Sequence, residues 1–225
     1  MTDRVSVIVP VYNGEAFLRE AVESALAQTH PPVDIVICDD GSTDETPRIA
    51  QSLPVVYLRQ ENAGVSAARN AAIARATGDA FAMLDADDIW LPDKLAVQLA
   101  ALSGDTSAFA VCQFQFLLDP DRPLPAWFGR ENPELPEMGY FAPSSWLVPR
   151  PVWERVGPFR PELRTAEDLD WFARASDAGI RRVVVPRTLL RRRVHDHNLT
   201  GEVPSPVQAW FDTLRASVAR KLGRA

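Results

Sequence analysis

Short apolar runs alternate with amphipathic segments along the first hundred residues. An unbroken apolar run such as VSVIVPV indicates a strand buried on both faces, whereas apolar residues spaced three and four apart indicate a helix. Runs of the first kind predict strands over 5–11, 33–40, 55–60 and 80–88. Segments of the second kind predict helices over 13–28, 41–53, 63–77 and 91–102, with Asn13 as N-cap of the first.

This order of strands and helices predicts a parallel sheet with helices on both faces. In such sheets ligands bind outside the carboxyl ends of the strands, so the polar residues there are candidates for a site. These residues are Tyr12, Asn13, Asp39, Asp40, Asp85, Asp87 and Asp88. We therefore expect the acidic side chains to converge on one edge of the sheet.

The pattern changes after residue 103. The run SAFAVCQFQFLL predicts a strand over 107–118, and the proline-rich stretch 119–143 predicts a long surface loop. The remaining elements are a short strand and turn over 144–159, a helix over 165–180 with Thr165 as N-cap, a strand over 181–186, a basic loop, and a terminal helix over 205–222. No linker separates two independent domains.

Composition supplies a core but no membrane anchor. Hydrophobic residues make up 46% of the 225 residues, which is ample for a buried core. Cys38 and Cys112 are expected to be reduced core residues. No apolar run is long enough to span a membrane, and the N-terminus lacks the features of a secretory signal. We therefore expect a cytoplasmic protein.

Charge is distributed unevenly. The net charge of −6 divides into −9 over residues 1–112 and +3 over residues 113–225. An acidic half argues against nucleic acid as a partner, because a phosphate backbone needs a basic face. It agrees better with a site that holds a metal cation, while the arginine-rich half could face an anionic ligand.

The segment MLDADDIW places Asp85, Asp87 and Asp88 at a predicted strand end. Because side chains alternate along a strand, Asp85 and Asp87 are expected on the same side, where they repel each other unless a cation lies between or beside them. Mg²⁺ or Mn²⁺ suits such a site, since hard cations take few protein carboxylates and complete their shell with water and phosphate oxygens. The alternative is a polar turn in which Asp88 or Asp93 caps the next helix.

Two further acidic pairs allow more than one interpretation. Asp39 and Asp40 either form an Asx-type turn or accept hydrogen bonds from a base N–H or from ribose hydroxyls. Glu167 and Asp168 open a predicted helix. Either Asp168 completes a capping box with Thr165, or one of the two acids is a general base.

A basic segment, RRRVHDHNLT, follows the last predicted strand. His195 and His197 could reach a metal or could simply be exposed. Arginines 191–193 form either a solvated run or an anion clamp.

Five stretches of the sequence, read in order, resemble the catalytic domain of glycosyltransferase family 2. They are VSVIVPVYNGEAFLREAVESALAQT, DIVICDDGSTDET, ENAGVSAARNAAIARATGD, FAMLDADDIWLPDKLAVQLAAL and AEDLDWFARASDAG. Other common motifs are absent: the sequence has no G-x-G-x-x-G fingerprint, no P-loop and no G-x-S-x-G nucleophile elbow.

The resemblance implies an α/β fold of the GT-A type, with a Rossmann-like, mostly parallel sheet flanked by helices and a C-terminal acceptor-side region. Residues 1–103 would form the nucleotide-sugar-binding half, and 104–202 the acceptor-binding and catalytic-base half of the same domain. Residues 203–225 would form a C-terminal amphipathic helix. That helix either packs on the parent domain, which we favour, or contacts the inner membrane surface.

The resemblance also implies roles for single residues. Asp168 would be the catalytic base, and Asp87 and His195 would bind the metal, Mn²⁺ or Mg²⁺. Tyr12 would stack on the nucleoside base, and Arg69 would approach the nucleotide. The full set of substrate-binding residues is Pro10, Tyr12, Asn13, Asp39, Asp40, Arg69, Asp85 and Glu167.

The activity implied is transfer of a sugar, with inversion, from a nucleoside diphosphate sugar, expected to be UDP-linked, to the hydroxyl of a carbohydrate or lipid-linked acceptor. Such reactions build cell-surface polysaccharides and glycoconjugates. One alternative is a non-catalytic nucleotide-sugar-binding domain, against which the intact Asp85, Asp87 and Asp168 argue. The other is a sugar-1-phosphate nucleotidyltransferase, which would be expected to show a glycine-rich basic loop where PVYNGEAFL stands.

Overall fold

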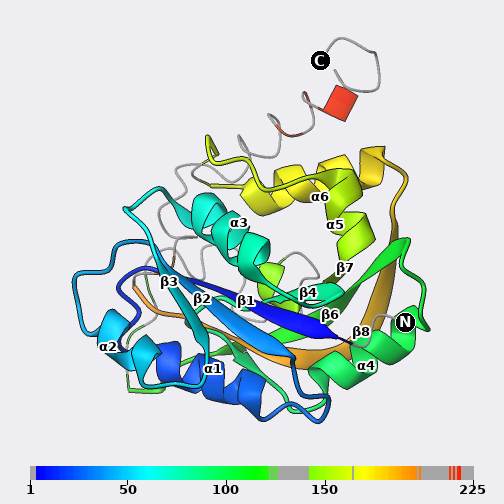
Figure 1. Ribbon diagram of the computed structural model, residues 1–225. Coiled ribbons are helices and arrows are strands. Elements are labelled where there is room, and N and C mark those ends of the chain that lie inside the picture. The colour runs from blue at the N-terminus through cyan, green and yellow to red at the C-terminus, as the bar shows by residue number, and fades with distance from the viewer. Residues whose placement is uncertain are drawn as a thin grey trace.

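A mixed eight-stranded sheet with helices on both faces forms the centre of this computed structural model (Figure 1). The residues described are 4–121, 123, 125, 142–163, 165–196, 198, 213, 215, 217 and 218. The strands are β1 (Val5–Val11), β2 (Asp34–Asp39), β3 (Val56–Arg59), β4 (Ala80–Met83), β5 (Ile89–Trp90), β6 (Ala108–Leu117), β7 (Trp146–Pro149) and β8 (Arg181–Arg193). The helices are α1 (Leu18–Leu26), α2 (Thr46–Gln51), α3 (Val65–Arg75), α4 (Lys94–Leu102), α5 (Arg150–Val156), α6 (Glu167–Asp177) and the 3₁₀ helix η1 (Pro143–Ser145).

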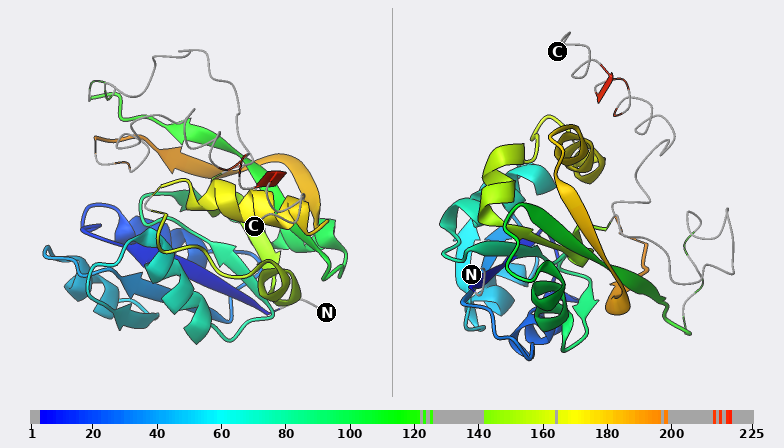
Figure 2. Two further views of the ribbon diagram at one scale, coloured as in Figure 1. Left: turned by 90° about the horizontal axis from the view of Figure 1, so that it is seen from above. Right: turned by 90° about the vertical axis from the view of Figure 1, so that its right-hand side faces the viewer.

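The strand order across the sheet is β3-β2-β1-β4-β7-β6-β8-β5. The first four strands run parallel, as predicted, so β1, β2 and β4 present their carboxyl ends at one edge. β7 is antiparallel to β4 and β6, whereas β6 and β8 run parallel and lie side by side (Figure 2). β5 pairs antiparallel with β8, so the chain that leaves β4 crosses to the far end of the sheet order within a few residues.

Each face of the sheet has its own apolar layer. Helices α1, α2 and α4 cover one face, and α3, α5 and α6 cover the other (Figure 1). Alternation along β1 explains the division, because Val7 packs in the first layer and Ile8 in the second. The second layer is aromatic: the Trp146 ring centroid lies 5.2 Å from that of Trp171, and both residues are fully buried.

A buried lysine ties α4 to the strands beneath the acidic edge. Lys94 Nζ donates to Gln98 Oε1 at 2.9 Å and lies 4.0 Å from the Trp90 ring centroid. Burial lowers the pKa of Lys94 to about 8. Gln98 Nε2 in turn donates to the carbonyl oxygen of Ser145 at 2.8 Å, and the Trp90 indole N–H donates to that of Ser144 at 3.0 Å. These contacts hold η1 in place next to the β4 end.

The sequence-based strands over 5–11, 33–40, 55–60 and 107–118 are confirmed within one or two residues. The strand predicted over 80–88 is too long, since β4 ends at Met83 and a turn follows. The strand predicted over 181–186 is too short, because β8 continues to Arg193 between β6 and β5. The basic segment at arginines 191–193 is therefore strand and not loop.

Two predicted helix starts are wrong. The N-cap of α1 is Phe17, because Asn13 lies four residues earlier and bonds to another loop. The N-cap of α6 is Ala166 and makes no side-chain cap hydrogen bond, so Thr165 is not the cap. The segment 144–159 also contains a helix, α5, that was predicted as a turn. Its Pro151 occupies the first helical turn, where a missing N–H costs nothing.

Most of the expected C-terminal helix and most of the expected surface loop over 119–143 lie outside the described residues. Four residues of the terminal segment are helical, and Ser217 Oγ donates to Asp177 Oδ1 of α6 at 2.7 Å. Within the described part of the chain, no helix combines the length and apolar character that crossing a membrane requires.

Candidate active site

The ends of β1 and β2 form the first part of the site. The N–H of Asp40 donates to the carbonyl oxygen of Val11 at 2.8 Å, which keeps the two strand ends together. Pro10 is buried in β1 opposite Cys38. Tyr12 follows the strand and leaves 53% of its surface exposed, so its ring is available to a ligand.

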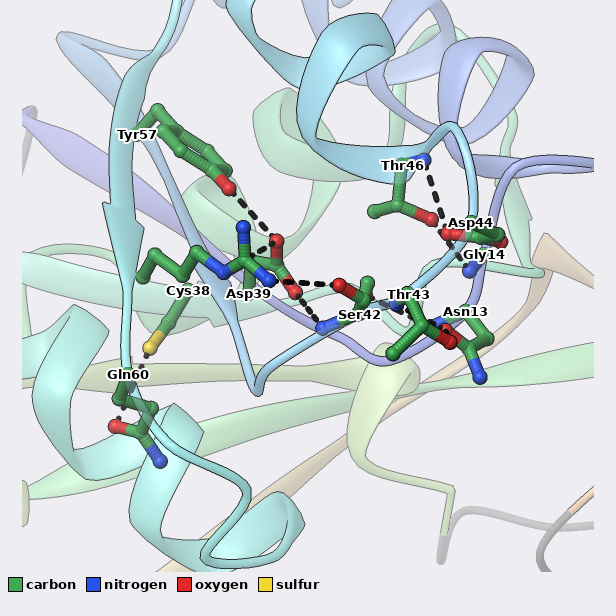
Figure 3. Close-up of polar contacts among 11 residues, drawn as sticks. Asn13, Gly14, Cys38, Asp39, Ser42, Thr43, Asp44, Thr46, Tyr57 and Gln60 are labelled. Carbon is green, nitrogen blue, oxygen red and sulfur yellow. Dashed lines mark hydrogen bonds and ion pairs between the residues drawn. The ribbon is translucent and has the colours of Figure 1, made fainter.

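Asn13 and Asp39 organise the loop that leads from β2 to α2 (Figure 3). The N–H of Asn13 donates to Ser42 Oγ at 2.9 Å, and its side-chain oxygen accepts from the N–H of Thr43 at 2.9 Å. Asp39 is fully buried. Its carboxylate accepts from the N–H of Ser42 at 2.8 Å and from the Tyr57 hydroxyl at 2.7 Å. Asp39 therefore stabilises the loop through buried hydrogen bonds.

Asp40 joins β2 to the start of α3. Its Oδ1 accepts from Gln60 Nε2 at 2.7 Å and from the N–H of Ala63 at 2.9 Å, and its Oδ2 accepts from the N–H of Gly64 at 2.8 Å. Gly64 is the N-cap of α3 and has a φ of 91°, a conformation that favours glycine. The Asp40 carboxylate thus supplies the acceptors that the helix start lacks.

Arg69, on α3, connects the acidic turn to α6. Nη2 donates to Asp85 Oδ1 at 2.7 Å, and Nη1 donates to Glu167 Oε1 at 2.5 Å. The guanidinium is buried, which opposes its charge, but the two carboxylates outweigh burial and raise the pKa of Arg69. Nε finds no acceptor among the described residues. Both Nη atoms of Arg69 are thus paired with carboxylates of the protein itself.

Asp168 follows Glu167 at the start of α6, and its side chain is half-buried. Its Oδ1 accepts from the N–H of Leu169 at 2.8 Å. Burial, with the neighbouring charge of Glu167, raises the pKa of Asp168 to about 7, while Arg69 acts in the opposite direction. Ala166, just before, has a φ of 63°, which a non-glycine residue rarely adopts and which is typical of functional sites.

The acidic segment 85–88 is a turn, closed by a bond from the N–H of Asp88 to the carbonyl oxygen of Asp85 at 3.1 Å. Strand alternation therefore does not apply to Asp85 and Asp87. The N–H of Asp85 donates to Ser144 Oγ of η1 at 2.9 Å. Asp88 is buried and accepts from the N–H of Arg193 at 3.2 Å. Burial, assisted by the other two acids, raises the pKa of Asp88 well above its usual range.

The Asp87 side chain contacts the segment that follows β8. Its Oδ2 lies 2.9 Å from His195 Nε2 and accepts from Asn198 Nδ2 at 2.9 Å. His195 and Asp87 are far apart in the sequence, and the fold brings their side chains into direct contact. His197 lies outside the described residues. Asn198 was not predicted, and its only sequence signal is its place in the same polar segment.

A second unpredicted group, Glu20, Phe17 and Arg193, packs around this pair. Arg193 Nε donates to the carbonyl oxygen of Asp87 at 3.2 Å, and Nη2 donates to Glu20 Oε2 at 2.6 Å. Its guanidinium lies 4.7 Å from the Phe17 ring centroid, which is 4.8 Å from that of His195. Arg193 thus clamps the acidic turn, a role that neither earlier interpretation included.

The donor atoms of Asp87 and His195 suit Mn²⁺ better than Mg²⁺, because one of the two is an imidazole nitrogen. Two protein ligands are enough for such a cation when substrate phosphates and water complete its shell. Within the described ranges, no three side chains of His, Cys, Asp or Glu gather to form a metal site by themselves. A cation held here would take its remaining ligands from water or from a bound phosphate.

This combination of fold and site places the chain in a known class. The sequence model of glycosyl transferase family 2 matches residues 6–149, and the chain belongs to that family. An uncharacterized glycosyltransferase of Rickettsia typhi is 29% identical over 241 residues, covering 97% of this chain and 72% of that protein. The putative teichuronic acid biosynthesis glycosyltransferase TuaG of Bacillus subtilis is 40% identical over 127 residues, covering 53% of this chain and 50% of that protein.

Solved structures show the same GT-A type fold. Staphylococcus aureus TarS in complex with UDP-GlcNAc gives a TM-score of 0.75 at 20% identity, covering 95% of this chain and 65% of that chain. The mannosyltransferase PcManGT of Pyrobaculum calidifontis, in complex with GDP-Man and Mn²⁺, gives 0.66 at 23% identity, covering 87% and 58%. The chain thus spans less than two thirds of either solved structure.

Proposed function

We propose that the chain transfers a sugar, with inversion, from a UDP-linked donor to the hydroxyl of a carbohydrate or lipid-linked acceptor. Cell-surface polysaccharide or glycoconjugate synthesis is the setting that the teichuronic acid relative supports. The proposal depends on the bridge from Asp85 through Arg69 to Glu167. This bridge joins the acidic turn 85–88, whose Asp85 and Asp87 form the D-x-D motif, to the residue beside Asp168. A donor-side acid and a candidate base are thereby held in one network.

Asp168 is the proposed base. A hydroxyl is a poor nucleophile until its proton is removed, and a carboxylate with a pKa of about 7 is both ionised and basic near neutral pH. As the acceptor oxygen attacks the anomeric carbon, its proton passes to Asp168. The bond to the diphosphate oxygen breaks on the opposite face, which inverts the configuration, as in inverting glycosidases.

The donor side is formed by the β1, β2 and β4 ends. Tyr12 offers an exposed ring for the base, and Asn13, Asp39 and Asp40 shape the loops around it. Asp85 faces the ribose or the donor sugar. Asp87 and His195 would hold Mn²⁺ or Mg²⁺, and a bound cation neutralises the negative charge that develops on the leaving diphosphate.

Two measurements on Asp168→Asn test the proposal. Titration calorimetry with UDP and Mn²⁺ should give the wild-type affinity, whereas release of UDP from UDP-sugars in the presence of acceptor extracts should be lost. Glu154→Gln, an exposed acid on α5, is the matched control and should keep both. Preserved turnover in Asp168→Asn would remove Asp168 as the base.

A non-catalytic binding domain makes a different prediction. It would bind UDP with Mn²⁺ and release no UDP from any UDP-sugar. Proton NMR of the product tests the stereochemistry, because the anomeric coupling must differ from that of the donor if the reaction inverts.

A further inference from the structure

The turn after β8 is closed by the side chain of Asn198. Its Oδ1 accepts from the backbone N–H of His195 at 2.7 Å, and its Nδ2 donates to the carbonyl oxygen of Arg193 at 3.2 Å. A backbone N–H requires an acceptor and a carbonyl requires a donor, so the two contacts settle which end of the amide is oxygen. Asn198 is 7% exposed, so water does not compete strongly for these bonds.

The amide nitrogen of Asn198 faces the two atoms assigned to the metal. It lies 2.9 Å from Asp87 Oδ2 and 3.3 Å from His195 Nε2, and these two atoms are 2.9 Å apart. One side chain therefore contacts a carboxylate from the turn after β4 and an imidazole from the turn after β8. Groups that orient metal ligands in this way affect metal affinity strongly, although they do not touch the ion.

Stacking alone does not define the orientation of His195. Phe17 packs against the imidazole with an interplanar angle of 38°. Such a contact restrains the plane of the ring but permits a flip of about 180° around the Cβ–Cγ bond, which exchanges the nitrogen and carbon positions. Bonds to atoms in the plane, such as those made by Asn198 and Asp87, determine which nitrogen faces the acidic turn.

We propose that Asn198 is a positioning residue that keeps Asp87 Oδ2 and His195 Nε2 together as a pair of metal ligands. The inference rests on the proposed function, which takes these two residues as the ligands. The amide also engages lone pairs that a cation uses, but organisation outweighs this competition, because Asp87 and His195 belong to separate segments and the Asn198 contacts join them.

Binding of Mn²⁺ alone tests this role without reference to turnover. Asn198→Ala removes all the amide contacts, and we expect Mn²⁺ affinity, measured from the electron paramagnetic resonance signal of the free ion, to fall by about tenfold or more. Asp196→Asn is the control, since Asp196 is exposed in the same turn and should leave the affinity close to that of the wild type.

Asn198→Asp is a second variant of nearly the same shape. It keeps the acceptor for the His195 N–H but replaces the donor that faces Asp87 with a carboxylate. The cation-free protein should melt below the wild type because the two carboxylates repel. Mn²⁺ should then raise its Tm by more than it raises that of the wild type, since the cation relieves this repulsion only in the folded state.

The outcomes are distinguishable from those of the proposed function. Equal or tighter Mn²⁺ binding by Asn198→Ala, or an Mn²⁺-induced Tm shift in Asn198→Asp no larger than in the wild type, overturns the positioning role and leaves the metal site intact. A lower Tm in Asn198→Ala with unchanged Mn²⁺ affinity does the same, because it shows a purely structural role. Failure of the wild type to bind Mn²⁺, with or without UDP, overturns both.

Discussion

Asp85 and Glu167 share one guanidinium, that of the buried Arg69. The two acids come from opposite halves of the chain, one from the turn after β4 and the other from the first turn of α6. Because neither carboxylate can lose Arg69 without leaving charge unbalanced, this bridge sets the spacing between the turn after β4 and the start of α6.

Replacing Arg69 with methionine should destabilise the protein strongly. The side-chain volume is roughly kept, but two poorly exposed carboxylates lose their partner, a change that costs about 3–5 kcal/mol in comparable cases. Urea unfolding measures the loss. The pKa of Asp168 should also rise, because Arg69 is the larger of the two arginine charges that oppose its increase.

Arg48→Met is the matched control for this experiment. Arg48 pairs with Glu45 at the surface, where such ion pairs contribute about 1 kcal/mol or less. Arg69→Lys should fall between wild type and methionine, since a single ammonium keeps the charge but lacks the fork that reaches both acids. If Arg69→Met were as stable as Arg48→Met, the bridge would have no structural role.

The pH dependence of activity should reflect Asp168. A base must be deprotonated to act, so kcat/KM should rise with pH and level off above about 7, the value at which burial places the pKa of Asp168. A rate profile measured at saturating Mn²⁺ checks this. If kcat/KM instead rose with pH through the ordinary carboxyl pKa range, Asp168 would not be the group that titrates.

The raised pKa of Asp168 also predicts how the stability of the protein changes with pH. Asp168 binds its proton more tightly when folded than when unfolded, so its contribution to stability is complete below pH 3.8 and is lost as the pH rises to about 7. Asparagine carries no such charge. Asp168→Asn should therefore melt at or above the wild-type Tm at about pH 8, which calorimetry can measure while transfer is lost.

Asp87→Asn should weaken Mn²⁺-dependent binding of UDP by about tenfold or more, because it removes a charged ligand next to His195. Titration calorimetry with and without Mn²⁺ provides the measurement. Asp93→Asn, whose carboxylate pairs with Arg187 away from the turn, is the control and should retain the Mn²⁺ effect. Equal affinity in the two variants would exclude Asp87 as a ligand.

Asp40→Asn should lower the free energy of unfolding by about 1–3 kcal/mol, because an amide nitrogen would face donors that now bond to a carboxylate. The affected donors are Gln60 Nε2 and the N–H groups of Ala63 and Gly64. Urea unfolding beside UDP titration separates the two possible effects. Weaker UDP binding without any loss of stability would instead indicate a direct contact.

The first half of the fold was accessible from the sequence because its strands are buried on both faces. β1 occurs at the predicted residues, since a short apolar run rich in valine and isoleucine favours a strand buried on both faces. The length of β8 was underestimated because this strand is rich in arginine and is not an unbroken apolar run. Its arginines pair with acids from other elements, Arg181 with Asp105 and Arg187 with Asp93, and such partners are not visible in a local window.

The candidate site shows the same limit. The residues of the D-x-D turn and of the α6 start were identifiable from local motifs, but the partner of each was not. Arg69 was expected to approach the nucleotide, whereas its two Nη atoms contact Asp85 and Glu167. Asn198 lacks a motif of its own, and only the return of the chain beside Asp87 reveals it.

The bridge through Arg69 also has a consequence for protein engineering. Hybrids that combine residues 1–103 of this chain with the later part of a relative would test whether that later part sets acceptor choice, as proposed. Any such hybrid must bring an acid to the place of Glu167, or Arg69 would meet a neutral neighbour in a buried position. Exchange of specificity between family members is therefore restricted by an internal charge balance as well as by the surfaces that touch the sugars.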